Sequence, residues 1–122
     1  MTRRVVITGV GALCGVGHNA AQSWDAIKNG VSGAGKITRY DASQHHVQIA
    51  CELKNWNATD YMSAKELRRH DRYQHYAYAV AKEALAQAGW NLTTEDERSR
   101  TSVVVGSSVG GVESHRENTL IV

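Results

Sequence analysis

The fold is decided by residues 3–11, which read Arg-Arg-Val-Val-Ile-Thr-Gly-Val-Gly. Within them, residues 4–8 form a short run of apolar and β-branched side chains that ends at Gly9. A run of this kind is typical of a strand that is buried on both faces of a parallel sheet. The glycines at positions 9, 11, 15 and 17 then predict a tight loop. The chain is therefore expected to enter a layered fold on a buried strand.

A helix and an edge strand are expected next. Asn19 is placed to cap a helix, with Gln22 at the reciprocal capping position and Gly30 as the stop. In residues 47–53 the apolar Val47, Ile, Cys and Leu positions alternate with Gln, Ala and Glu. This period of two predicts a half-exposed strand with Cys51 packed on its apolar face.

The clearest element is a long helix. Residues 63–66, Ser-Ala-Lys-Glu, form a capping box, apolar residues recur at helical spacing from Tyr73 to Ala88, and Gly89 ends the pattern. The many alanines on this face favour close packing against a sheet. Residues 94–97 are expected to cap a short turn, and residues 112–122 to begin an amphipathic helix.

A second buried strand is expected at residues 101–105, Thr-Ser-Val-Val-Val, with a glycine-rich loop behind it. The order of strand, helix, edge strand, long helix and strand indicates an α/β fold with a mostly parallel sheet and packed helices. Two central strands are too few for a covered sheet. The pattern is therefore interpreted as an incomplete part of a fold.

Composition excludes several classes of protein. With 122 residues, 42% of them hydrophobic and 21% charged, the chain has the make-up of one small globular domain, with no internal boundary expected. A net charge of +2 is too small to indicate a nucleic-acid partner. The opening apolar run is too short for a signal peptide or a membrane span. Two distant cysteines, Cys14 and Cys51, are expected to be free thiols in the cytoplasm.

The glycine loops do not predict a nucleotide cofactor. A Rossmann loop that began at Gly9 and Gly11 would need a third glycine where this chain has Cys14, and its short-chain dehydrogenase variant would need one at Leu13. Residues 106–111, Gly-Ser-Ser-Val-Gly-Gly, lack the Lys-Ser/Thr ending of a phosphate loop. Both segments are interpreted as backbone turns. A small nucleotide-dependent oxidoreductase remains an alternative hypothesis, for which NADPH binding would be diagnostic and is not expected.

Neither the histidines nor the cysteines form a recognisable reactive site. His70 and His75 are five residues apart and miss the same-face spacing of a zinc helix. Surface positions and no metal are expected for the six histidines, which are His18, His45, His46, His70, His75 and His115. A reactive thiolate needs a helix N-terminus or a basic neighbour. Cys51 is expected to be packed, and Cys14 is expected in a loop before a helix.

One cluster of charge stands out. Lys65, Arg68 and Arg69 are spaced three and four residues apart, so on a helix they share one face. Positive charge near a helix N-terminus opposes the helix dipole, and that cost suggests a purpose such as an acidic partner. The spacing alone supports a partner-binding site and an ordinary solvated helix face equally.

Taken in order, these segments resemble β-ketoacyl-acyl carrier protein synthases of the type II branch. The resemblance runs along the whole chain, and its specificity lies in the ordered set of motifs. The matching segments are residues 3–11, Trp24 with the Gly-Val-Ser-Gly turn at 30–33, the basic stretch 65–73, the helix end 84–89 and the strand-loop 105–111.

The resemblance implies a thiolase-like fold, with residues 1–122 as the N-terminal part of the synthase's N-terminal domain. The family condenses acyl groups with malonyl-acyl carrier protein during fatty acid elongation and works as a homodimer without a cofactor. Its nucleophilic cysteine and its two catalytic histidines match no residue of this chain, so no catalytic residue is carried over. We therefore expect the chain to be inactive alone.

Two sites are carried over from the family. Lys65, Arg68 and Arg69 match the basic residues that dock acyl carrier protein, and Val109 matches a branched apolar residue of the acyl pocket. One departure is the usual Ser-Pro or Thr-Pro pair, which is Cys14-Gly15 here, so the first loop is expected to be looser. A non-catalytic carrier-binding fragment and a polyketide ketosynthase-like fragment remain alternatives. No nucleic-acid or membrane partner is expected.

Overall fold

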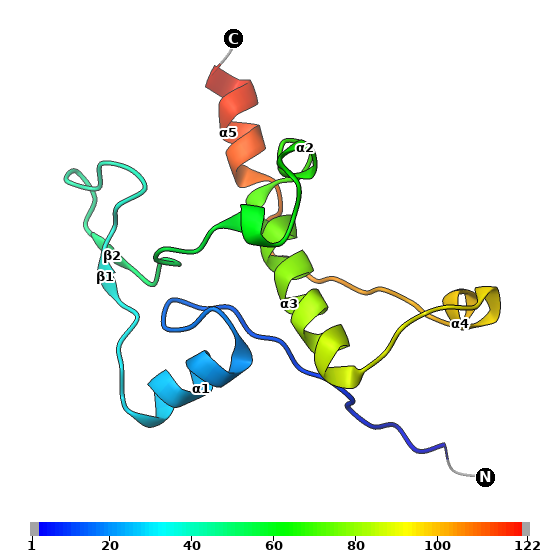
Figure 1. Cartoon of the computed structure of the whole chain (residues 1–122). Coiled ribbons are helices and arrows are strands. Elements are labelled where there is room, and N and C mark those ends of the chain that lie inside the picture. Colours follow the sequence, from blue (N-terminus) through cyan, green and yellow to red (C-terminus); the bar gives the residue numbers. More distant parts are fainter. Residues whose placement is uncertain (1–2, 121–122) are drawn as a thin grey trace. The chain divides into compact units, whose positions relative to one another are not determined.

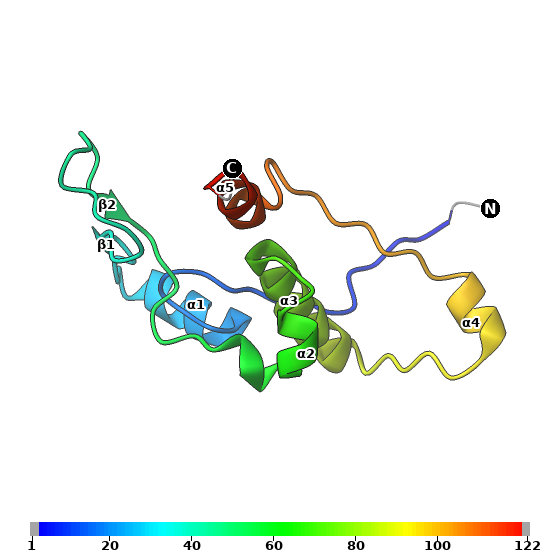
Figure 2. The same ribbon diagram turned by 90° about the horizontal axis from the view of Figure 1, so that it is seen from above.

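The computed structural model describes residues 3–120, which belong to two compact units. Residues 11–56 form the hairpin unit, and residues 3–10 together with 57–120 form the helical unit. The helical unit contains the 3₁₀ turn η1 (Ala58–Asp60) and four α-helices. Figures 1 and 2 show two views of these elements, which are α2 (Ala64–Leu67), α3 (Arg72–Ala88), α4 (Glu95–Ser99) and α5 (Val112–Leu120).

The expected long helix is divided into α2 and α3. The Ser63–Glu66 capping box is confirmed, but α2 ends at Leu67 and a second capping box opens α3. In that box the Asp71 carboxylate accepts the Arg72 backbone N–H at 2.8 Å, and Gln74 Oε1 accepts the Asp71 N–H at 2.8 Å. The first backbone N–H groups of α2 and of α3 are thus each satisfied by a capping box of their own, which favours two separate helices over one continuous helix. Gly89 ends α3 as expected, with a left-handed φ of 61°.

Polar contacts join the starts of α3 and α5. Ser114 Oγ donates to Asp71 Oδ2 at 2.9 Å, and Arg72 Nε forms an ion pair with Glu113 Oε2 at 3.1 Å. The helix expected from residue 112 is therefore present as α5. Its two large apolar residues at the ends, Val112 and Leu120, are both exposed, so the expected amphipathic stripe is not developed.

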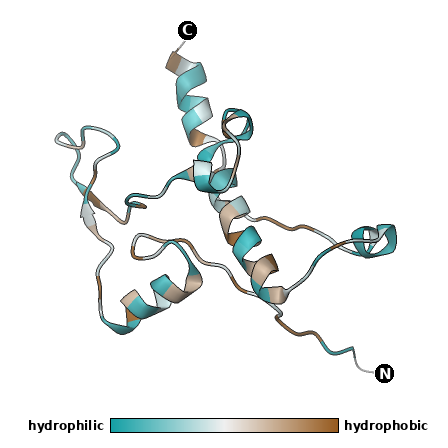
Figure 3. Ribbon diagram, in the orientation of Figure 1, coloured by the Kyte–Doolittle hydropathy of each residue, from teal (hydrophilic) through white to brown (hydrophobic). Residues whose placement is uncertain are grey.

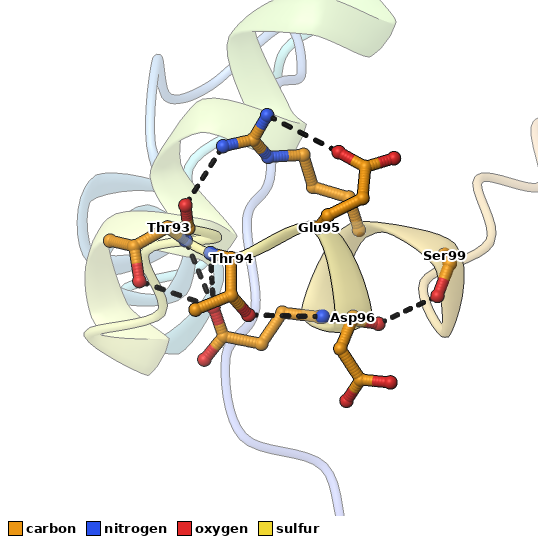
Figure 4. A network of polar contacts seen from close by, with 7 residues as sticks. Thr93, Thr94, Glu95, Asp96 and Ser99 are labelled. Atoms are coloured by element: carbon orange, nitrogen blue, oxygen red, sulfur yellow. Dashed lines mark hydrogen bonds and ion pairs between the residues drawn. The ribbon is translucent and has the colours of Figure 1, made fainter.

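The short helix α4 is built almost entirely by its own capping contacts, drawn in Figure 4. Glu97 Oε2 accepts the backbone N–H groups of Thr93 and Thr94 at 3.0 and 2.9 Å, and the Glu97 N–H donates to Thr94 Oγ1 at 3.2 Å. The predicted Thr94–Glu97 cap is thus confirmed. An i,i+3 ion pair between Glu95 and Arg98, at 3.8 Å, adds a small surface contribution.

The two predicted buried strands are not formed. Within the described chain, residues 4–8 and 101–105 lie outside any strand, and their side chains are largely exposed, up to 93% at Val5 and Val104. Figure 3 shows brown, apolar stretches in these irregular segments. Strand formation requires a hydrogen-bonded neighbour and a covering layer, and neither is supplied to these segments by residues 3–120. The expected mostly parallel sheet is therefore not observed.

Close backbone contacts explain two of the glycines in the helical unit. A Cβ at Gly9 would collide with the Ala84 carbonyl oxygen of α3, so the chain can pass over the alanine face of this helix only without a side chain. The Val10 N–H then donates to Gln87 Oε1 at 2.6 Å. A Cβ at Gly110 would lie 2.9 Å from Tyr73 Cζ. Each of these two glycines thus lies where the backbone passes close to another element of the helical unit.

The hairpin unit contains α1 (Ala20–Lys28) and two short strands, β1 (Gly35–Lys36) and β2 (Ile49–Ala50). Asn19 caps α1 as expected, its Oδ1 accepting the Gln22 N–H at 2.8 Å, while Gln22 Oε1 accepts from the His18 N–H at 3.0 Å. The strands pair antiparallel, with Gly35 opposite Ala50. Only the centre of the predicted strand 47–53 is therefore formed.

The expected burial of that strand is wrong. Val47 and Ile49 are 65% and 62% exposed, and Cys51 is exposed rather than packed. The partner strand is only two residues long, and within residues 11–56 no second layer covers the apolar face. The alternating pattern predicted the strand correctly at its centre, but it carries no information on whether another layer packs against the apolar face.

We predict that Asp71→Ala destabilises the first turn of α3 by about 1 kcal/mol, the usual cost of losing an N-cap. Amide hydrogen exchange in this turn should accelerate about fivefold, which corresponds to that free energy. Asp25→Ala is the matched control, because it removes only an exposed carboxylate that pairs with Lys28 at 3.3 Å. Equal exchange rates in the two variants would contradict the capping role.

Candidate functional site

The candidate site is the basic cluster, defined as Lys65, Arg68 and Arg69, at the end of α2. A compact turn positions it. Ser63 Oγ accepts the Glu66 N–H at 3.3 Å, while Glu66 Oε2 accepts the Ser63 N–H at 2.9 Å and its hydroxyl at 2.6 Å. These reciprocal bonds satisfy the start of a helix that is too short to be stable by propensity alone.

All three side chains of the basic cluster are exposed. Lys65 lies within α2, Arg68 is its C-cap residue, and the Arg69 N–H donates to the Glu66 carbonyl at 2.9 Å. The expectation that the cluster opposes a helix dipole at an N-terminus is therefore corrected. Because α2 ends at Leu67, Arg68 and Arg69 follow its C-terminus, where positive charge is favourable.

Several other cations of the chain are paired with carboxylates. Arg72 pairs with Glu113, Arg98 with Glu95, and Arg100 with Asp96. In the described part of the chain, by contrast, no ion pair to an acidic side chain is formed by Lys65, Arg68 or Arg69. The basic cluster thus presents concentrated positive charge to the outside.

The carboxylate within this turn is held in its charged form. Hydrogen bonds from the Ser63 hydroxyl and backbone N–H lower the pKa of Glu66, and the charge of His70 lowers it further. An ionised Glu66 keeps the capping box intact at neutral pH. The Glu66 carboxylate thus stabilises the turn that carries the basic cluster, and its hydrogen bonds are made to Ser63 within the capping box.

Val109 lies in the loop before α5 and is 70% exposed. A pocket of about 260 Å³ in the helical unit is lined by Trp90, Glu97, Arg100 and Thr101, so Val109 is not among its walls. The acyl-pocket role of Val109 therefore stays a prediction.

The remaining candidate residues form no metal or membrane site in the described chain. Across residues 3–120, no three His, Cys, Asp or Glu side chains are grouped as metal ligands would be. Over the same residues, no helix combines the length and the apolar character that crossing a bilayer requires. Among the histidines, His18 and His75 are half-buried, and His45 packs edge-on against Tyr40 at a centroid distance of 5.6 Å.

Sequence reasoning missed two features near these sites. The Asp71–Gln74 capping box, which separates the basic cluster from α3, has a readable Asp-x-x-Gln signature. The second is the neighbourhood of the two cysteines, because Gly15, the residue after Cys14, approaches Cys51. Nothing in the sequence indicates that proximity.

Comparison with known proteins places these features in a family. Residues 2–120 match the family described as beta-ketoacyl synthase, N-terminal domain, and the chain therefore belongs to it. Membership implies the thiolase-like α/β fold that the resemblance suggested.

Individual relatives agree with that assignment. The chain is 42% identical over 112 residues to a 3-oxoacyl-acyl-carrier-protein synthase 2 of Staphylococcus aureus (strain COL), an alignment that covers 92% of this chain and 27% of that protein. A synthase 2 of Vibrio harveyi is 37% identical over 111 residues, covering 91% of this chain and 26% of that protein. The chain thus spans about a quarter of the length of these relatives.

We predict that Ser63→Ala raises the pKa of Glu66, because the largest cause of its lowered pKa is the Ser63 hydroxyl. A carboxyl whose pKa is lowered by folding stabilises the turn above its unfolded pKa, about 4.3, and loses that stabilisation as pH falls through the folded value. An NMR titration of the Glu66 carboxyl carbon measures the shift. Ser99→Ala, which removes a hydroxyl of α4, should leave the titration unchanged. An unaltered Glu66 titration in Ser63→Ala would count against the proposed cause.

Proposed function

We propose that this chain is the part of a β-ketoacyl-acyl carrier protein synthase that docks the acidic carrier protein during fatty acid elongation. The observation that carries the proposal is the basic cluster, in which three exposed cations lie within five residues. Their charge is therefore accessible to a partner. Relatives at 42% and 37% identity carry the synthase 2 name, and that name includes the acyl carrier protein.

Charge complementarity suits such a partner. An acidic surface that approaches Lys65, Arg68 and Arg69 gains attraction at long range, which raises the association rate more than the lifetime of the complex. The contacts are exposed, so salt screens them over about 8–10 Å at physiological ionic strength. A transient, salt-sensitive complex is what delivery of successive acyl groups requires.

The complete synthase would hold the acyl chain as well as the carrier. We propose that Val109 lines the acyl pocket there, near the interface of a homodimer, and that the protein acts in the cytoplasm. An exposed apolar side chain in a glycine-flanked loop is suited to being covered by another part of an assembly. The same holds for the exposed valines of residues 103–105.

Changing Lys65, Arg68 and Arg69 together to Ala should weaken binding of labelled acyl carrier protein about tenfold or more, since each exposed ion pair contributes up to about 1 kcal/mol. Fluorescence anisotropy titrations at low and high salt measure the effect, and the salt dependence should fall in the variant.

The matched control changes Lys28, Arg98 and Arg100 to Ala. It removes the same formal charge from residues that are already in surface ion pairs. Its binding should stay close to that of the unchanged protein. An equal loss of carrier-protein affinity in both triple variants would refute docking by the basic cluster. It would show that only the net charge of the chain affects binding.

We further propose that the condensing chemistry depends on residues other than those of this chain. Incubation with labelled acyl-carrier protein should therefore leave no acyl thioester on Cys14 or Cys51. Alkylation of both thiols by iodoacetamide in a parallel sample shows that they were available. A hydroxylamine-sensitive acyl group on either cysteine, found by mass spectrometry, would sink this assignment and make that residue a candidate nucleophile.

A further inference from the structure

The hairpin unit brings its two cysteines into one neighbourhood. Cys14 begins the turn before α1, and Cys51 directly follows β2. At Gly15, the residue that follows Cys14, an added Cβ would lie 3.3 Å from Cys51 Cβ and 3.3 Å from the Cys51 carbonyl carbon. The residue adjacent to Cys14 is thus in contact with Cys51. Figures 1 and 2 both show the loop before α1 beside the segment that follows β2.

Cys14 is held in a defined position within its turn. Its backbone N–H donates to the Gly17 carbonyl at 2.9 Å, and the Gly17 N–H donates back to the Cys14 carbonyl at 3.2 Å. A hydrogen bond of 3.3 Å joins Cys14 Sγ to Ser23 Oγ, and Ser23 is only 5% exposed. The sulfur is therefore fixed by a buried hydroxyl on α1.

The surroundings of Cys14 favour its thiolate. The Ser23 hydroxyl lowers the pKa of Cys14, and hydrogen bonds to the backbone of Val16 and Gly17 lower it further, against a smaller opposing effect of burial. The thiolate is the form of cysteine that attacks peroxides and other electrophiles. Cys14 is half-buried and Cys51 is exposed, so small oxidants can reach both thiols.

We propose that Cys14 and Cys51 form a peroxide-responsive dithiol, in which Cys14 is oxidised first and Cys51 resolves it. The Cys14 thiolate attacks one oxygen of a hydroperoxide, the O–O bond breaks, and the products are Cys14 sulfenic acid and the alcohol or, from hydrogen peroxide, water once a proton is taken up. The Cys51 thiol then attacks the Cys14 sulfur, displaces water and forms the disulfide. Two electrons pass from the dithiol to one peroxide molecule.

The geometry supports the second step. A disulfide requires Cα atoms within about 7 Å of each other. Gly15, the residue that follows Cys14, lies against Cys51, and a glycine backbone can adjust without moving a side chain. The bond would tie the turn before α1 to the end of β2. In a reducing compartment such a bond is transient and suited to sensing.

The test treats the whole protein, at low concentration, with a small excess of hydrogen peroxide. Unchanged protein should lose both free thiols and two hydrogen atoms of mass while remaining a single chain on non-reducing gels. Peptide mapping should find the Cys14–Cys51 disulfide, and a thiol reductant should restore both thiols. A disulfide between chains, or an unbridged Cys51, overturns the proposal.

Variants assign the two roles. Cys51→Ser should stop at a Cys14 sulfenic acid, which a cyclic 1,3-diketone probe captures, and Cys14→Ser should consume peroxide about tenfold more slowly, as expected without an activated thiolate. Ser23→Ala should slow oxidation of Cys14 severalfold while keeping both thiols. Equal peroxide rates for Cys14→Ser and Cys51→Ser refute the order of events. A wild-type rate in Ser23→Ala refutes activation by the hydroxyl.

Discussion

The Asp71 carboxylate is the acceptor on which the helical unit depends most. One oxygen caps the start of α3 through the Arg72 N–H, and the other accepts the Ser114 hydroxyl of α5 at 2.9 Å. Few apolar residues are buried in residues 3–120, where only Ala42 and Ala79 fall among the buried hydrophobic positions. With so little apolar burial, polar contacts at helix starts determine where each helix begins and which helices meet.

Helix boundaries were predictable because capping is local. Asn19, Ser63, Thr94 and the terminating Gly89 were all identified from sequence, since a cap depends on residues no more than about four positions apart. The Asp71–Gln74 cap was equally local and was overlooked in favour of one long helix. The strands predicted at residues 4–8 and 101–105 are not formed in the described chain. Their formation depends on distant partners, which alternation and β-branching do not specify.

The candidate site divides in the same way. The residues of the basic cluster follow from the sequence, but their electrostatic setting does not, because it depends on α2 ending at Leu67. What the sequence cannot show is which cations are already neutralised by neighbours such as Glu113. The approach of Gly15 to Cys51 is likewise a product of the hairpin fold, since these residues are thirty-six positions apart in the sequence.

The contact between Gly9 and the Ala84 carbonyl has a consequence for alignment along α3. The residues on either side, Thr8 and Val10, both carry a Cβ, so sliding the segment by one position would place a side chain where only hydrogen fits. Gly9 therefore fixes the register of the N-terminal segment relative to α3. A slip of one residue turns every side chain of a strand to the opposite face of its sheet. In any sheet that residues 4–8 join, the Gly9 contact would therefore determine which of Val5, Val6 and Ile7 face α3.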